Sequence, residues 1–137
     1  MKDITGLAIS VFLGSGLGGV CRLFISLYIE RRIASCASAA GQALFPWPTL
    51  CVNIAGCFLL GVFFGFFARL APSASVKAFF TVGFCGGLTT FSTFALENLS
   101  LLESGRWAVA ATYIASSLIL GLIAAYAGRA LIQCLYP

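Results

Sequence analysis

The most informative stretch of the sequence is residues 83–94, Gly-Phe-Cys-Gly-Gly-Leu-Thr-Thr-Phe-Ser-Thr-Phe. They lie inside an apolar segment, residues 76–99, which is long enough for the roughly 20-residue span of a bilayer core. Paired glycines followed by paired threonines form helix poorly. Unpaired backbone groups are costly in lipid, so a break there must face protein or a wet cavity. A tight glycine crossing between two helices is the alternative, but the hydroxyls disfavour a purely apolar contact. We predict a transmembrane helix that is broken at its centre.

Three further apolar segments of similar length surround this one, which predicts an all-α membrane protein. Of the 137 residues, 61% are hydrophobic and only 9% are charged, whereas soluble domains carry about 25% charged residues. We predict a single four-helix transmembrane domain over residues 1–137 that crosses the membrane several times. Its helices are expected over 4–29, 47–68, 76–99 and 107–132.

Composition excludes most other function classes. The chain has eight Lys or Arg, four Asp or Glu and no His, so the commonest general base is missing and acids are too few for most carboxylate or metal sites. We therefore expect no enzyme. The basic residues are scattered between apolar blocks, which predicts no nucleic-acid partner. The six cysteines form no CxxC pair and are read as small apolar packing residues.

The basic residues are nearly balanced across the predicted membrane. Four spans place both termini and the second connection on one side, together with Lys2, Arg69, Lys77 and Arg129. The opposite side has Arg31, Arg32 and Arg106, with Arg22 close enough to reach it. The positive-inside rule then gives no orientation. The chain could insert both ways and pair as an antiparallel homodimer, or one orientation could be set by another signal.

Small residues predict close helix contacts in two places. Gly14 and Gly18 are four residues apart, as are Gly61 and Gly65. This spacing is typical of helices that pack backbone to backbone in membranes. Glycine is also common in membrane helices generally, so each pair is a weak signal.

Uncharged donors and aromatic rings form a candidate anion pathway. Phe91 and Phe94 share one helix face, and the electropositive edges of their rings can solvate an anion weakly. Thr49 and Asn53, four apart in the second helix, add a hydroxyl and an amide. The fourth helix adds a similar stripe: Tyr113, Ser117 and Gly121.

Each of these features has a plainer interpretation. Phenylalanines in membrane helices are usually packing residues. A Ser or Thr hydroxyl can bond a carbonyl one turn earlier in its own helix, which we expect for Thr112 and Ser116. Asn53 is the exception, because an amide within a span is costly without a function or a helix contact.

Two charged side chains are expected at the depth of this pathway. Arg22 and Glu97 lie near the ends of the first and third predicted helices, on the same side of the membrane. An ion pair between them is the favoured interpretation. Alternatively, Arg22 draws anions into a vestibule.

The motifs together resemble the small bacterial fluoride channels, the Fluc or CrcB family. The resemblance is carried by residues 18–22 (Gly-Gly-Val-Cys-Arg), by residues 49–58 with Gly61 following, and most specifically by residues 83–94. The fourth helix matches more loosely through Tyr113 and Ser117. It departs at Gly121, where some relatives have a hydroxyl.

The resemblance implies a fluoride-selective channel that allows passive fluoride efflux through the bacterial inner membrane and gives fluoride resistance. It implies an antiparallel, dual-topology homodimer with two pores, lined by Phe91 and Phe94, in which Asn53 donates to fluoride. It also implies a structural sodium ion at the two-fold axis, held by the backbone carbonyls of Gly86 and Thr89 from both subunits.

A small multidrug exporter is the main rival, since it also has four helices and can be dual-topology. Its proton coupling needs a carboxylate embedded in the membrane, typically in the first helix. Here that helix carries Arg22, and Glu97 in the third is the only candidate acid.

Overall fold

The four predicted membrane spans are helical in a computed structural model that describes residues 4–36 and 45–136. Four helical stretches within these residues are long and apolar enough to cross a membrane: 4–35, 47–70, 74–103 and 107–135. The elements are α1 (Ile4–Cys36), α2 (Trp47–Leu70), α3 (Ala74–Ala78), the π-helix η1 (Phe79–Cys85), α4 (Gly86–Leu88), α5 (Phe91–Glu103) and α6 (Trp107–Leu135). The prediction of an all-α protein with four such helices is confirmed.

The helices are longer than hydropathy predicted. The largest difference is at α1, which ends at Cys36 instead of residue 29, and the third span ends at Glu103 instead of residue 99. Arg, Glu and Leu favour helix in water as well as in lipid, so hydropathy marks only the apolar part of each helix. Lys2 and residues 37–44 of the predicted first connection lie outside the described residues.

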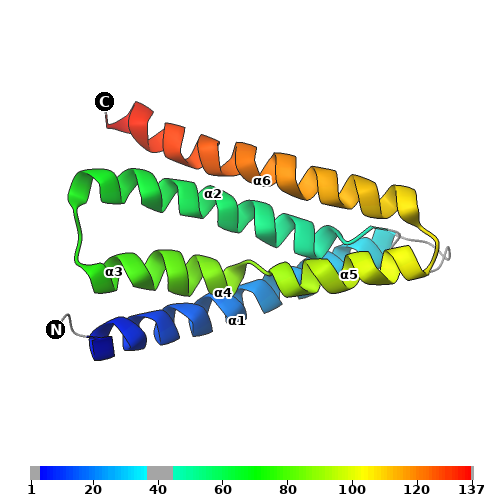
Figure 1. The fold of residues 1–137 in the computed structure, drawn as a ribbon, viewed down its shortest axis with the longest axis horizontal. Helices are drawn as coiled ribbons and strands as arrows, with labels where there is room; N and C mark the ends of the chain where they lie inside the picture. Colours follow the sequence, from blue (N-terminus) through cyan, green and yellow to red (C-terminus); the bar gives the residue numbers. More distant parts are fainter. Residues whose placement is uncertain (1–3, 37–44, 137) are drawn as a thin grey trace.

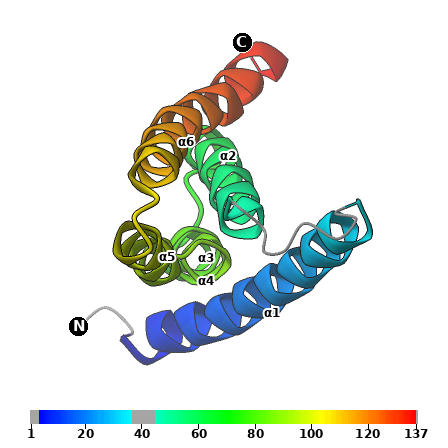
Figure 2. The same cartoon turned by 90° about the vertical axis from the view of Figure 1, so that its right-hand side faces the viewer.

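Both described ends of the chain lie at the same end of the bundle as the α2–α3 connection, and the α5–α6 connection lies at the other end (Figure 1). The elements α3, α4 and α5 lie between α1 on one side and the α2–α6 pair on the other (Figure 2). The third span is therefore central in the bundle.

Both predicted glycine pairs lie at helix crossings. A methyl group added to Gly14 or Gly18 would collide with the backbone of η1 and α4, and one added to Gly61 would collide with the backbone of Ala125 in α6. At Gly65 it would come within 2.9 Å of the Ile132 side chain. These contacts confirm the predicted close packing, because only glycine lets the backbones approach this far.

The third span loses its helical structure at the threonines of the central motif and not at the paired glycines Gly86 and Gly87, and the residues before them form the π-helix η1. Gly86 and Gly87 are helical within α4, whereas Thr89 (φ −82°, ψ 160°) and Thr90 (φ −148°, ψ 117°) have extended backbones between α4 and α5. A methyl group on Gly87 would collide with the backbone of Ser15, while Gly86 has open space. Gly87 therefore serves a helix crossing, and the β-branched threonines take the extended conformation they favour.

Candidate functional site around Thr89 and Thr90

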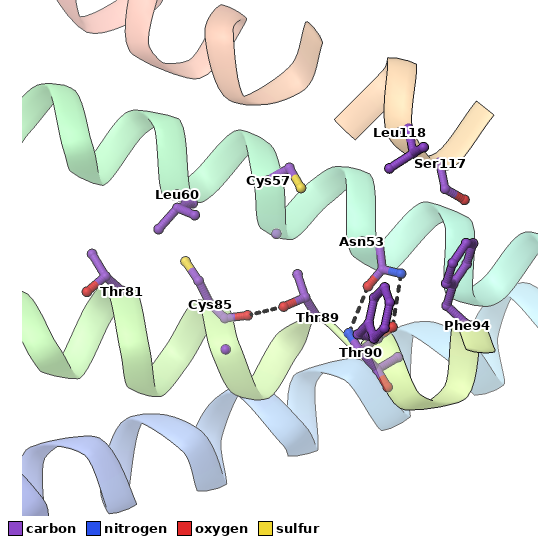
Figure 3. A pocket seen from close by; sticks show the side chains of 13 residues that line it. Asn53, Cys57, Leu60, Thr81, Cys85, Thr89, Thr90, Phe94, Ser117 and Leu118 are labelled. Atoms are coloured by element: carbon purple, nitrogen blue, oxygen red, sulfur yellow. Dashed lines mark hydrogen bonds between the residues drawn. The ribbon is translucent and has the colours of Figure 1, made fainter. Parts of the chain in front are cut away.

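Side chains from α1 and α2 satisfy the backbone groups of the extended threonines. Thr90 N donates to Asn53 Oδ1 at 2.8 Å, and Asn53 Nδ2 donates to Thr90 O at 3.2 Å (Figure 3). Arg22 Nη1 donates to Thr89 O at 3.2 Å. A regular helix would direct the Thr90 N–H to the carbonyl of Gly86. Asn53 replaces that bond and leaves the Gly86 carbonyl without it.

The Asn53 amide retains one donor after this pairing. Because Thr90 N–H must meet an oxygen, the orientation of the carboxamide follows from the hydrogen bonds. The NH₂ group has two hydrogens, and the Thr90 carbonyl takes one of them. Asn53 can therefore hold the backbone and still offer an N–H to a ligand.

Asn53 lines a cavity of about 340 Å³ between α2, the third span and α6. None of the described residues in its wall is charged. They are Asn53, Gly56, Cys57, Leu60, Thr81, Cys85, Gly86, Thr89, Thr90, Phe91, Phe94, Ser117 and Leu118. The cavity thus joins polar, uncharged groups to apolar and aromatic walls (Figure 3).

Three predicted pathway residues meet Asn53 in this cavity: Phe91, Phe94 and Ser117. The two rings have centroids 5.8 Å apart and planes tilted by 39°. Ser117 Oγ is buried and has no hydrogen-bond partner within the part of the chain that the structure describes. Figure 3 shows the Ser117 side chain pointing from α6 toward Phe94. A buried hydroxyl without a partner is costly, so it points to a ligand.

The hydroxyls of Thr49 and Tyr113, which we predicted to line the anion pathway, both donate hydrogen bonds to Glu97. Thr49 Oγ1 donates to Glu97 Oε1 and Tyr113 OH donates to Glu97 Oε2, each at 2.7 Å. Neither residue lines the cavity of Asn53. Sequence reasoning placed Glu97 at the same depth but did not recognise that its two oxygens would bind both hydroxyls. The carboxylate joins α2, α5 and α6 in this way.

The predicted ion pair between Arg22 and Glu97 is wrong. Arg22 donates to the Thr89 carbonyl, and Glu97 accepts from the two hydroxyls. Both side chains line a second cavity, of about 380 Å³, together with Thr49, Thr90 and Glu30. Thr90 lines both cavities, so its pairing with Asn53 lies between a charged cavity and a neutral one.

Two predicted hydroxyl bonds within α6 are present. Thr112 Oγ1 donates to Ala108 O at 2.8 Å, and Ser116 Oγ donates to Tyr113 O at 3.1 Å. Both residues bond their own helix, as expected. Ser117, one residue further along, differs because its hydroxyl lacks such a bond.

Comparisons with known proteins show the family of this chain. Residues 9–129 match the family described as "CrcB-like protein, Camphor Resistance (CrcB)". The chain belongs to the CrcB family. It is 41% identical over 128 residues to a "Fluoride-specific ion channel FluC" of Bacteroides fragilis, covering 93% of this chain and 94% of the relative.

Two further CrcB relatives carry the same name. One, from Phocaeicola vulgatus, is 41% identical over 118 residues, covering 86% of this chain and 91% of the relative. The other, from Flavobacterium psychrophilum, is 42% identical over 119 residues, covering 86% and 90%. The resemblance stated from the sequence is thereby confirmed.

The structure gives no support to a proton-coupled exporter in this CrcB chain. That mechanism needs an acid exposed to the substrate cavity. Glu97 lines the second cavity and not the neutral one, and both its oxygens already accept hydrogen bonds.

We expect Glu97→Gln to destabilise the fold, because a carboxamide offers one oxygen where the carboxylate offers two acceptors. The amide NH₂ would face a hydroxyl that now donates. The expected loss is about 1–2 kcal/mol of unfolding free energy, seen as a lower melting temperature in detergent. Glu103→Gln is the matched control, since Glu103 is an exposed acid in the same helix. Equal melting of the two variants would contradict the structural role of Glu97.

Proposed function

We propose that this chain is a fluoride-selective channel that lets fluoride leave the cell passively across the bacterial inner membrane and so gives fluoride resistance. The observation that carries the proposal is the uncharged cavity in which Asn53 keeps a spare N–H and Ser117 has a buried, unpartnered hydroxyl. Support also comes from relatives named as fluoride-specific ion channels and from four helices able to cross a membrane.

The chemistry of this cavity suits a small anion that must pass through. Fluoride is strongly hydrated, so a pore has to replace its water with short donors. Amide and hydroxyl groups supply these, and the ring edges of Phe91 and Phe94 add weak electropositive contacts. A fixed positive charge would hold the anion too firmly, whereas weak sites let it leave. In this mechanism Arg22, in the second cavity, raises the local anion concentration.

We propose that two inverted copies form the channel. Phe91, one of the cavity residues, is 81% exposed in a single chain and would otherwise face lipid. A second copy would cover this ring. The near balance of basic residues across the two membrane sides supports insertion in both orientations. The proposed channel is therefore an antiparallel homodimer with two pores.

We also propose a structural sodium ion between the two copies, with Gly86 and Thr89 as its ligands. The residues fit this role: the Gly86 carbonyl is released because Thr90 N–H donates to Asn53, and the space beside Gly86 is open. Thr89 O already accepts from Arg22, but a carbonyl has a second lone pair. When bound, the ion would supply positive charge and tie the two extended segments together.

Replacing sodium with N-methyl-D-glucamine should lower the melting temperature of the purified dimer, because a ligand bound only to the folded state stabilises it. Adding sodium back should restore the melting temperature. Potassium at the same ionic strength is the control for general salt effects. Melting that is unchanged without sodium would remove the proposed ion.

Liposomes that contain the protein should release fluoride rapidly down its gradient and release chloride hardly at all. The amide and hydroxyl donors that line the cavity can replace the water of the smaller, more strongly hydrated halide. Ion-selective electrodes measure both fluxes in matched vesicles, with protein-free liposomes as the control. Equal fluoride and chloride fluxes would contradict the proposed function.

Phe91→Ile and Asn53→Asp should each reduce fluoride flux at least about tenfold, the scale of one lost contact of roughly 1.4 kcal/mol. The first removes an aromatic edge, and the second replaces the spare N–H with negative charge. Phe12→Ile is the matched control, because Phe12 is 77% exposed and lies outside the cavity wall. Size-exclusion chromatography checks that the dimers assemble. Unchanged flux in both variants would remove these residues from the pathway.

A further inference from the structure

Cys57 lines the neutral cavity, but the channel mechanism proposed for this chain gives it no role. It follows Asn53 by four residues in α2, so the two share a helix face. Both line the neutral cavity, and Figure 3 shows them along its α2 wall. The thiol is therefore the next polar group after the Asn53 amide along this wall.

The thiol lies where the polar stripe of α6 ends. Tyr113, Ser117 and Gly121 are spaced by four residues, and Gly121 has no side chain to continue the stripe. A methyl group built on Gly121 would lie 3.5 Å from Cys57 Sγ. The sulfur of α2 therefore borders the space that a hydroxyl at position 121 would occupy.

An unpartnered group beside this place points to a ligand. Ser117 lies one turn before Gly121, lines the same cavity and has a buried Oγ without a hydrogen-bond partner among the described residues. The S–H group of cysteine is a weak donor. Along the wall, the Asn53 amide, the Ser117 hydroxyl and the Cys57 thiol thus form a series of uncharged donors.

We propose that Cys57 replaces the missing hydroxyl as a donor in the pathway, and that a soft, thiol-seeking cation closes the pathway by binding there. This inference rests on the proposed channel function. Thiol sulfur binds soft metal ions strongly, and Hg(II) is the simplest probe. With mercuric chloride, the sulfur bonds to mercury, one chloride leaves, and the thiol proton passes to water. No atom is oxidised or reduced, and the bound mercury chloride occupies the cavity.

Other cysteines of the chain provide matched controls. Cys51 lies in the same helix and Cys134 in α6; both are exposed and outside the cavity wall. Cys85 lines the cavity from η1 but is only 3% exposed. Reaction at Cys57 can therefore be separated from reaction at the lipid-facing thiols and at the buried one.

The experiment measures fluoride release from liposomes before and after mercuric chloride, added to both sides. The wild-type flux should fall about tenfold or more, as expected for a blocked pore, and excess 2-mercaptoethanol should restore it. Cys51→Ser and Cys85→Ser should stay sensitive. Cys57→Ser should still conduct measurably but lose less than about half of its flux, since a hydroxyl does not bind mercury. Sensitivity that persists in Cys57→Ser, or disappears in Cys85→Ser, would overturn the assignment.

A rescue pair tests the donor role without mercury. Cys57→Ala should lower fluoride flux several-fold, and adding Gly121→Ser should raise it again, because the new hydroxyl borders the place that the thiol occupied. The Cβ at position 121 would lie at an ordinary van der Waals distance from Cys57 Sγ, and removing the sulfur makes room for the serine hydroxyl. Unchanged flux in Cys57→Ala would reject the donor role.

Mass spectrometry keeps the test independent of any variant's folding. In the wild type, mercury should protect Cys57 from alkylation, and failure to protect it would reject the binding site. Wild-type liposomes that release no fluoride would instead reject the channel function itself. Fluoride release that mercury leaves untouched would reject only the role of Cys57.

Discussion

The reciprocal hydrogen bonds between the Asn53 carboxamide and the backbone of Thr90 hold the third span in its interrupted form and fix it against α2. Inside a bilayer no water can satisfy an interrupted helix. Each unpaired buried group would cost about 1–3 kcal/mol. The extended conformation of Thr89 and Thr90 persists because Asn53 and Arg22 bind its amide and carbonyl groups. The positions of α1 and α2 are tied to the third span by the same contacts.

The polar side chains of the bundle divide into those that hold the fold and those left free for a ligand. Thr49 and Tyr113 are committed to Glu97, which joins three helices. Asn53 serves both purposes, because one amide hydrogen binds Thr90 and the other remains. The Ser117 hydroxyl has no partner among the described residues. In the proposed channel, the free donors face an uncharged cavity and the charged residues lie in a separate one.

Predictions from the sequence were correct for features that depend on residues close together in the chain. Runs of apolar residues identified the four spans, and glycine spacing identified two crossings that bring α1 against η1 and α2 against α6. The sequence analysis also grouped four candidate pathway residues, and the structure places all of them around one cavity: Asn53, Phe91, Phe94 and Ser117. The error over Arg22 and Glu97 arose because opposite charges at equal depth suggest a pair. Arg22 instead donates to a backbone carbonyl, and Glu97 accepts hydrogen bonds from two hydroxyls.

An all-α chain of four membrane-crossing helices, with a central motif unsuited to regular helix, can be predicted from the sequence, because hydrophobicity and backbone preference act over short distances. The packing of the helices is needed to explain why Gly86 and Gly87 stay helical while the threonines become extended, since Asn53 of α2 and Arg22 of α1 satisfy the extended backbone. The tertiary structure also determines which hydrogen-bond donors are already paired and which remain free for a ligand. Hydrogen bonds between residues 37 to 67 positions apart leave no periodic trace in the sequence, so their partners emerge only when the helices are packed.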